Sequence, residues 1–186
     1  LVGAPYSDEF SPNAGMAFIY KASTLNSEPI SSWEDADHII LGDTTNESFG
    51  TSVHKLGDLD GDGLDDVGIA VQYGKLYIFY ASTLAGNTIL SVSDADVVLT
   101  NYGETVASAG DVDNDGKIDL MFGSYSTYSW RGVIYLLKGS MMNSPIVDIE
   151  QQGYQIIGSD VYSFLGCRDC FGSVGDVTGD GKDDVY

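Results

Sequence analysis

The sequence predicts an all-β fold made of four-stranded antiparallel sheets that follow one another as blades of a β-propeller. Three features support this prediction. An aspartate-rich loop of nine residues occurs three times, strand-like segments flank the loops, and a further strand segment returns after 59 and then 58 residues. Four short strands per period of about 40–65 residues are typical of a propeller blade. Since one blade cannot bury both of its faces alone, we expect neighbouring blades to stack around an axis.

The first acidic loop spans residues 58–66 and has carboxylates at its first, third, fifth and ninth positions. Carboxylates this close repel one another unless a cation lies between them. Hard oxygen ligands on a short loop favour calcium, which takes about 6–8 oxygens, and Gly63 permits the sharp turn around the ion. The expected ligands are the side chains of Asp58, Asp60, Asp62 and Asp66 and the backbone carbonyl of Leu64.

The same spacing returns in residues 111–119 and 176–184, again with glycine at the sixth position. One such loop alone could be a plain acidic turn, but three in register favour structural calcium, with up to three ions. Thr178 offers a neutral oxygen, so we expect the third site to bind more weakly. The remaining expected ligands are Asp111, Asp113, Asp115, Asp119 and the carbonyl of Lys117, then Asp176, Thr178, Asp180, Asp184 and the carbonyl of Lys182.

The loops differ from EF-hand loops, which carry a bidentate glutamate at position twelve and a helix on each side. The twelfth positions here are Ile69 and Phe122, and the third would fall beyond residue 186. The segments after the first two loops, residues 67–71 and 120–123, are short apolar runs that are typical of strands. We therefore expect each loop to join two strands.

The composition limits the classes of function. The 186 residues carry a formal charge of −20 with only eight Lys and Arg, which argues strongly against binding to nucleic-acid phosphates. Three calcium ions would bring this charge from −20 to −14 and relieve repulsion in the apo chain.

No apolar run is long enough to span a bilayer, and no signal peptide is found. The chain opens inside a strand-like segment, so we expect it to be a piece of a longer protein.

Cys167 and Cys170 are the two cysteines of the chain. A zinc site would need a second pair of ligands, and a thioredoxin-like pair would need a helix after it, which residues 171–175 do not resemble. The favoured interpretation is a disulfide formed in an oxidising compartment, with two free structural thiols as the alternative. Calcium and a disulfide together predict an extracellular location, secreted or at the cell surface.

Several strand segments recur with the loops. Residues 15–25 return as 74–84 and more loosely as 132–140, and residues 35–41 return as 94–100 and, in a third copy, as 154–158. The strand before each loop begins with a Phe-Gly type pair. These pairs are Phe49-Gly50, Tyr102-Gly103, and either Leu165-Gly166 or Phe171-Gly172.

The Phe-Gly pair, the acidic loop and Gly3-Ala4-Pro5 on the strand after the loop resemble the FG-GAP repeat of integrin α-subunit propellers and their bacterial relatives. Weaker copies of the Gly-Ala-Pro element are residues 70–72 and 123–125. The resemblance covers nearly the whole chain. It implies a seven-bladed β-propeller with calcium in the hairpin loops of several blades, and protein partners on the rim opposite those loops.

Three repeats, with boundaries at roughly 1–66, 67–119 and 120–186, are too few to close a ring, which typically needs about 4–8 blades. We expect further sequence to complete the ring, with several copies of the chain as the alternative.

The rim opposite the calcium loops holds the candidate binding residues. Tyr, Trp and Arg side chains tend to anchor interfaces, although aromatic packing between blades explains Tyr128 and Trp130 equally well. The candidate segments are residues 6–13 and 125–131, together with the blade links 45–47, 101–102 and 167–170.

No catalytic residue and no organic cofactor site is expected. His38 and His54 align with Val97 and Ala107 of the next repeat and have the character of incidental strand positions. No nucleophile elbow, phosphate loop or zinc signature occurs. The carboxylates without a metal role that remain are Glu9, Glu47 and Glu104, each in a loop or rim segment.

The leading interpretation is therefore a non-catalytic, calcium-stabilised extracellular module for adhesion or protein–protein interaction. Two alternatives stay open. One is a structural subunit of an extracellular fibre or surface layer, in which neighbouring copies are the partners. The other is the scaffold of a secreted calcium-dependent hydrolase or lyase.

Overall fold

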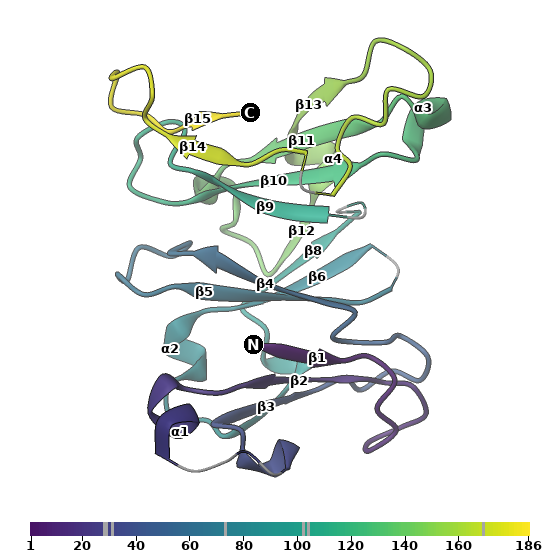
Figure 1. Cartoon of the computed structure of the whole chain (residues 1–186), viewed down its shortest axis with the longest axis vertical. Coiled ribbons are helices and arrows are strands. Elements are labelled where there is room, and N and C mark those ends of the chain that lie inside the picture. The colour runs from purple at the N-terminus through teal and green to yellow at the C-terminus, as the bar shows by residue number, and fades with distance from the viewer. Residues whose placement is uncertain (28–29, 31, 73, 102, 104, 169) are drawn as a thin grey trace. The chain divides into compact units, whose positions relative to one another are not determined.

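A computed structural model of the chain confirms the all-β class (Figure 1). It describes residues 1–27, 30, 32–72, 74–101, 103, 105–168 and 170–186. Tyr102 of the predicted link 101–102, Glu104, and Asp169 of the segment 167–170 lie outside these described residues. The chain divides into two units, the first formed by Leu1–His54 with Val67–Asp96 and the second by Lys55–Asp66 with Val97–Tyr186.

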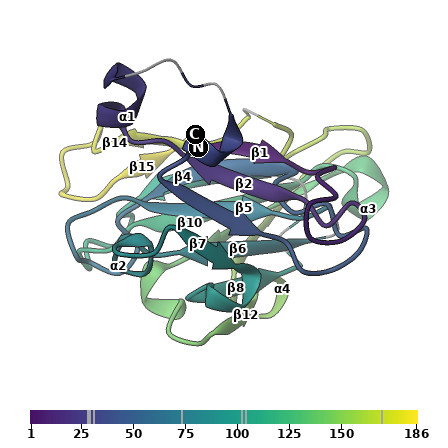
Figure 2. The ribbon, with the colours of Figure 1, turned by 90° about the horizontal axis from the view of Figure 1, so that it is seen from below.

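A four-stranded sheet of order β1-β2-β3-β7 lies in the first unit. Its strands are β1 (Val2–Ala4), β2 (Met16–Ile19), β3 (His38–Leu41) and β7 (Ile89–Ser91). The first three pair antiparallel, with β1 and β2 side by side in Figure 2, whereas β7 runs parallel to β3. One row across the sheet is formed by Gly3, Ala17, Ile40 and Leu90. Ala17 and Ile40 are fully buried and Leu90 is 3% exposed, so this row lies in the interior.

The recurring segments 15–25 and 74–84 are strands only in their first halves. β2 ends at Ile19, and β6 (Lys75–Phe79), which pairs antiparallel with β5 (Asp66–Ala70), ends at Phe79. The short helices α1 (Ala22–Ser27) and α2 (Ala81–Leu84) follow. An aspartate further along the chain accepts a hydrogen bond from the backbone N–H just before each helix. Asp37 accepts from the Lys21 N–H at 2.6 Å and Asp96 from the Tyr80 N–H at 2.7 Å. Expecting a strand over the whole segment was therefore wrong.

The second unit holds a sheet of order β13-β11-β10-β9, antiparallel throughout. Gly123, Ile134 and Ile156 form the row that corresponds to Gly3, Ala17 and Ile40 of the first sheet. The strands are β9 (Thr105–Gly110), β10 (Asp119–Ser124), β11 (Val133–Leu137) and β13 (Tyr154–Ile157).

A parallel pair, β8 (Val97–Thr100) and β12 (Ile146–Asp148), also lies in the second unit. The three-residue strands β7 and β12 have no counterpart among the strands expected from the sequence. The structure also has short helical turns: η1 (Trp33–Asp35), η2 (Val92–Asp94), α3 (Thr127–Trp130), η3 (Gly139–Met141) and α4 (Ile149–Gln152). Among the described residues, no helix is both long and apolar enough to cross a bilayer.

The Phe-Gly pairs pack tightly against the glycine of the Gly-Ala-Pro element. A Cβ on Gly3 would lie 2.1 Å from Gly50 O, and one on Gly123 would lie 2.2 Å from Gly166 O. Glycine is needed at these positions because the backbones touch there. Of the two candidates for the third pair, Leu165-Gly166 thus occupies the place of Phe49-Gly50, while Phe171 is a core residue, 4% exposed.

Candidate metal centre

All three acidic loops join strands, as predicted, and all three lie in the second unit. The first connects β4 (Ser52–Gly57) to β5, the second connects β9 to β10, and the third connects β14 (Ser173–Gly175) to β15 (Asp184–Val185). β9 pairs antiparallel with β10, and β14 with β15. The second and third loops therefore close hairpins, which excludes the helical flanks of an EF-hand for them.

The first aspartate of each loop organises the turn through backbone N–H groups. The Asp58 carboxylate accepts from Gly61 N at 2.7 Å, from Asp62 N at 3.1 Å and from Gly63 N at 2.8 Å. Asp176 accepts from the equivalent three groups, and these bonds, led by the one from Gly181, hold its pKa below the ordinary value. A carboxylate that accepts several N–H bonds favours its charged form, which is the form that binds a cation.

The aspartate at position five of each loop accepts a hydrogen bond from the backbone N–H of the residue at position seven. Asp62 Oδ1 accepts from Leu64 N at 2.8 Å, Asp115 Oδ1 from Lys117 N at 2.9 Å, and Asp180 Oδ1 from Lys182 N at 3.0 Å. Leu64 is 58% exposed, so its side chain contributes little packing to the core. The carbonyl ligands predicted at Leu64, Lys117 and Lys182 thus belong to residues that all three loops hold in the same way.

Two positions in each loop need a left-handed backbone, and only one was recognised in the sequence. The sixth residues Gly63, Gly116 and Gly181 have φ between 85° and 87°. The fourth residues are also left-handed, with φ of 88° at Gly61, 61° at Asn114 and 76° at Gly179. Gly and Asn are the residues that adopt this conformation most readily. The Gly, Asn, Gly series at position four was the signal that could have revealed it.

The side chains at positions one, three and five converge in two of the loops. Asp58, Asp60 and Asp62 can place one carboxylate oxygen each within 4.8 Å of one another, and so can the second-loop set of Asp111, Asp113 and Asp115. The third loop has only Asp176 and Asp180 for this purpose, because Thr178 stands between them. The ligand sets predicted for the first two loops are therefore brought together in part, by their three clustered aspartates.

One atom of the second cluster has no partner among the residues that the structure describes. Asp113 Oδ1 is buried, and none of these residues donates a hydrogen bond to it, whereas Asp113 Oδ2 lies 2.8 Å from Lys138 Nζ. A buried polar atom without a partner is costly, and a hard cation held by neighbouring carboxylates would satisfy it. The donor set, oxygen only and mostly anionic, fits calcium better than a transition metal.

The carboxylates at position nine of the loops lie apart from the clusters at positions one, three and five. Asp66 and Asp119 are fully buried, and each accepts from the N–H of its loop's second residue, Leu59 at 2.8 Å and Val112 at 2.9 Å. Asp119 also accepts from Gly139 N, and burial raises its pKa. Asp184 makes the same contact to Val177 N. Their part in binding an ion stays a prediction, and the structure adds a role in closing the loop.

Three of the residues considered for catalysis have structural contacts. His38 is 7% exposed, with Nδ1 2.6 Å from Asn87 O, and His54 Nε2 lies 2.9 Å from Ser52 Oγ. Glu47 forms an ion pair with Lys75 at 2.6 Å. Each group thus has a partner that fits a role in the fold.

Aromatic rings of the segment 125–131 pack on one another and on a later turn. Trp130 lies 6.3 Å from Tyr125 and 6.0 Å from Phe164 between ring centroids, and Phe164 lies 6.2 Å from Tyr162. Much of this aromatic cluster remains accessible, since Trp130 is 44% and Tyr162 66% exposed. Exposed, contiguous apolar side chains of this kind are typical of interaction sites.

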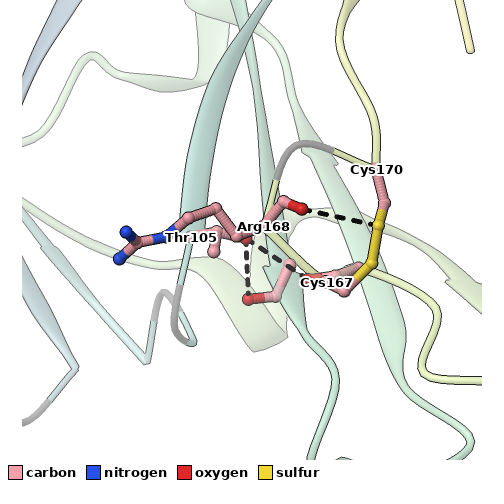
Figure 3. The surroundings of a disulfide bond; sticks show 6 residues. Thr105, Cys167, Arg168 and Cys170 are labelled. Atoms are coloured by element: carbon pink, nitrogen blue, oxygen red, sulfur yellow. Dashed lines mark hydrogen bonds between the residues drawn. A yellow bond between two sulfur atoms is a disulfide. The ribbon is translucent and has the colours of Figure 1, made fainter.

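Cys167 and Cys170 form the expected disulfide, with Cα atoms 5.4 Å apart (Figure 3). The bond closes a short turn directly after the Leu165-Gly166 pair. Thr105 Oγ1 donates to Gly166 O at 3.3 Å, which ties this turn to the start of β9. The favoured interpretation of the two cysteines is confirmed.

The chain is similar in sequence to a segment of the integrin α-subunits. It is 29% identical to integrin alpha-6 of Gallus gallus over 82% of its length, and 28% identical to integrin alpha-3 of Cricetulus griseus over 79%. It is 27% identical to integrin alpha-8 of Homo sapiens over 84%. The chain spans 15–16% of the length of these three subunits. No family model matches it. The matches confirm the resemblance that the FG-GAP motifs indicated.

Proposed function

We propose that this chain is a calcium-stabilised FG-GAP propeller module that acts outside the cell in adhesion or protein binding. The observation that carries the proposal is made in the second loop, where three aspartates converge and the buried Asp113 Oδ1 has no hydrogen-bond partner in the described part of the chain. The similarity to integrin α-subunits supports the adhesion role, and the Cys167–Cys170 disulfide supports an oxidising, extracellular location.

Calcium would be held by Asp58, Asp60 and Asp62 in the first loop and by Asp111, Asp113 and Asp115 in the second, with the carbonyls of Leu64 and Lys117. Bound ions would neutralise part of the −20 charge and fix the loops that join neighbouring strands. The third loop, with Thr178, would bind more weakly. The ions have a structural role in this proposal, and the chain performs no reaction with them.

Calorimetric titration with CaCl2 tests the metal site. We expect at least two binding events in the wild type, no comparable heat with MgCl2, and loss of one event each in Asp58→Ala and Asp111→Ala. Asp65→Ala is the matched control, because Asp65 lies in the first loop but pairs with Lys55 on the surface. A wild-type protein that gives no heat with calcium would contradict the proposal.

The aromatic cluster is the proposed partner surface. Protein partners favour exposed Tyr and Trp anchors, which carry much of the binding energy in known interfaces. Binding to a panel of immobilised extracellular-matrix proteins should decrease at least tenfold in Trp130→Ala. It should be unchanged in Tyr6→Ala, whose ring is 75% exposed in the first unit. Equal losses in both variants, or binding that does not depend on Trp130, would exclude this surface.

The alternatives make different predictions. A fibre or surface-layer subunit would assemble with itself as its concentration rises, which light scattering detects. A hydrolase scaffold would need two free carboxylates beside each other, and in the described chain Glu47 is paired with Lys75.

A further inference from the structure

A backbone hydrogen bond joins each of the two later acidic loops to the loop before it. The N–H of the residue at position eight donates to the carbonyl oxygen of the aspartate at position one of the preceding loop. Ile118 N donates to Asp58 O at 3.2 Å, and Asp183 N donates to Asp111 O at 3.0 Å. All four residues belong to the second unit. The same two positions thus connect the first loop to the second and the second loop to the third.

The glycine just before each of the first two loops adds a contact at the same place. A Cβ on Gly57 would lie 3.1 Å from a side-chain carbon of Ile118, and a Cβ on Gly110 would overlap the Asp183 carboxylate. That carboxylate accepts from Asp111 N at 2.9 Å. Because glycine leaves room for position eight of the next loop, neighbouring loops are packed together as well as hydrogen-bonded.

The aspartate at position one takes part in both its own loop and the next one. Its side chain is a proposed calcium ligand and accepts N–H bonds within its loop, from Asp115 N and Gly116 N in the case of Asp111. Its backbone carbonyl accepts the N–H of the next loop. Asp58 has the same two kinds of contact. An ion that orders this aspartate therefore also orders the acceptor to which the next loop is bonded.

The donor in the next loop belongs to the same peptide unit as a proposed calcium ligand. The Asp183 N–H shares its unit with the Lys182 carbonyl, and the Ile118 N–H shares its unit with the Lys117 carbonyl. These units are planar and trans, so the carbonyl and the N–H point in opposite directions. The bond to the preceding loop thus fixes the direction of the carbonyl at position seven. A cation on that carbonyl would in turn polarise the unit and strengthen the bond.

We propose that neighbouring acidic loops bind calcium cooperatively, because position one of each loop orients the carbonyl ligand at position seven of the next. This inference rests on the calcium binding proposed above and adds a coupling between the sites. The third loop, where Thr178 replaces a carboxylate, gains calcium affinity once the second loop is filled. Coupling between two binding sites is reciprocal, so an ion in the third loop strengthens the second site by the same factor.

Calcium titrations followed by NMR test the coupling, with the amide signals of Gly116 and Gly181 as reporters of the second and third loops. Asp111→Asn removes a charge from the second loop and keeps a side-chain oxygen that can accept the N–H bonds of the loop. The Gly181 midpoint should rise at least about fivefold, the lower end of usual coupling between sites. Asp176→Asn is the reciprocal variant and should raise the Gly116 midpoint by the same factor.

The matched control is Asp58→Asn, which makes the same change in the first loop. Asp58 is bonded to the second loop. This variant should therefore raise the Gly116 midpoint and leave the Gly181 midpoint within about twofold of the wild type, as nearest-neighbour coupling requires. Thermal unfolding in saturating calcium verifies that each variant is folded. If one reciprocal variant does not fold, the other still measures the same coupling.

Two outcomes would overturn the coupling and leave the proposed calcium binding intact. The first is midpoints that stay within about twofold of the wild type in both reciprocal variants, because the loops would then bind calcium independently. The second is an equal effect of Asp58→Asn and Asp111→Asn on Gly181, because the bonded neighbour would then have no special influence. Glycine signals that do not respond to calcium in the wild type would contradict the proposed function itself, and the coupling with it.

Discussion

Asp183 and Asp111 are joined by two reciprocal hydrogen bonds, one between their backbones and one to the Asp183 side chain. Asp183 N–H donates to Asp111 O at 3.0 Å, and the Asp183 carboxylate accepts from Asp111 N–H at 2.9 Å. Asp111 opens the second acidic loop and Asp183 lies in the third, so the two loops brace each other. A similar bond joins Ile118 N to Asp58 O at 3.2 Å, which connects the second loop to the first. An ion that orders one loop should therefore favour order in the next.

Asp183→Ala should weaken calcium binding in the second loop although Asp183 is not a predicted ligand. The variant leaves Asp111 N–H without its acceptor, at a cost of about 1–2 kcal/mol, and removes a nearby negative charge. Amide shifts of Gly63, Gly116 and Gly181 during a calcium titration report each loop separately. We expect the Gly116 midpoint to rise roughly tenfold. Asp65→Ala, at the same loop position in the first loop, should leave the Gly63 midpoint nearly unchanged, and equal shifts in both variants would refute the bracing.

Lys138→Met should strengthen calcium binding in the second loop. The Lys138 ammonium donates to Asp113 Oδ2, and this bond holds the pKa of Asp113 below its ordinary value. The same cation opposes a calcium ion in the loop, because like charges held close to each other repel. The Gly116 midpoint should fall about fivefold or more.

The control is Lys55→Met, which removes a surface pair with Asp65 outside the predicted ligand set. Its Gly63 midpoint should stay within about twofold of the wild type, since exposed ion pairs contribute little. A weaker affinity in Lys138→Met would show that Lys138 positions Asp113 for binding and does not compete with the ion.

Asn114→Ala should destabilise the second loop, and Asn114→Gly should not. Asn114 has a φ of 61°, which costs a residue with a Cβ about 1–2 kcal/mol unless it is Asn or Asp. Glycine already occupies this position in the other two loops. Urea unfolding in saturating calcium should give a loss of about 1 kcal/mol for the alanine variant and a change below about 0.5 kcal/mol for the glycine variant. Equal losses would mean that the Asn114 side chain, and not its backbone conformation, is required.

The acidic loops and the strands beside them could be predicted because their chemistry is local. Carboxylates at fixed spacing and a glycine at position six identify the loop within nine residues, and the FG-GAP resemblance supplied the rest of the blade. The three-residue strands β7 and β12 escaped prediction because three residues are too few to show a period of two. Their pairing with β3 and β8 joins residues about 50 positions apart, for example Ile40 with Leu90.

The ends of the repeated strands were misjudged for a different reason. The Ala-Ser-Thr-Leu segments carry apolar and β-branched residues, which suit a strand as well as a helix. Asp37 and Asp96 decide between the two, because each carboxylate accepts from the backbone N–H just before the helix and from a threonine hydroxyl within it. Such contacts come from residues 13–16 positions away and cannot be read from the segment itself.

The contact of Asp37 predicts a specific response to acid. The Lys21 N–H, and then the Thr24 hydroxyl, lower the pKa of Asp37 below its ordinary value of 3.8. Because the folded state has the lower pKa, this contribution to stability is present above pH 4 and is lost as the pH falls through the folded value. Asp37→Asn cannot titrate, so the stability difference between wild type and variant should shrink between pH 5 and pH 2. A difference that stays constant over this range would show that the charge of Asp37 contributes nothing.

The central claim is that calcium in the acidic loops holds the fold, and thermal unfolding with and without a chelator tests it most directly. Calcium at 100 times its dissociation constant adds about 2.7 kcal/mol per site, and each kcal/mol shifts the Tm of a domain of this size by about 2–4 °C. We predict that EGTA lowers the Tm by at least about 5–10 °C, that excess CaCl2 restores it, and that a double variant Asp58→Ala, Asp111→Ala responds far less. A Tm that is the same in EGTA and in CaCl2 would contradict the account.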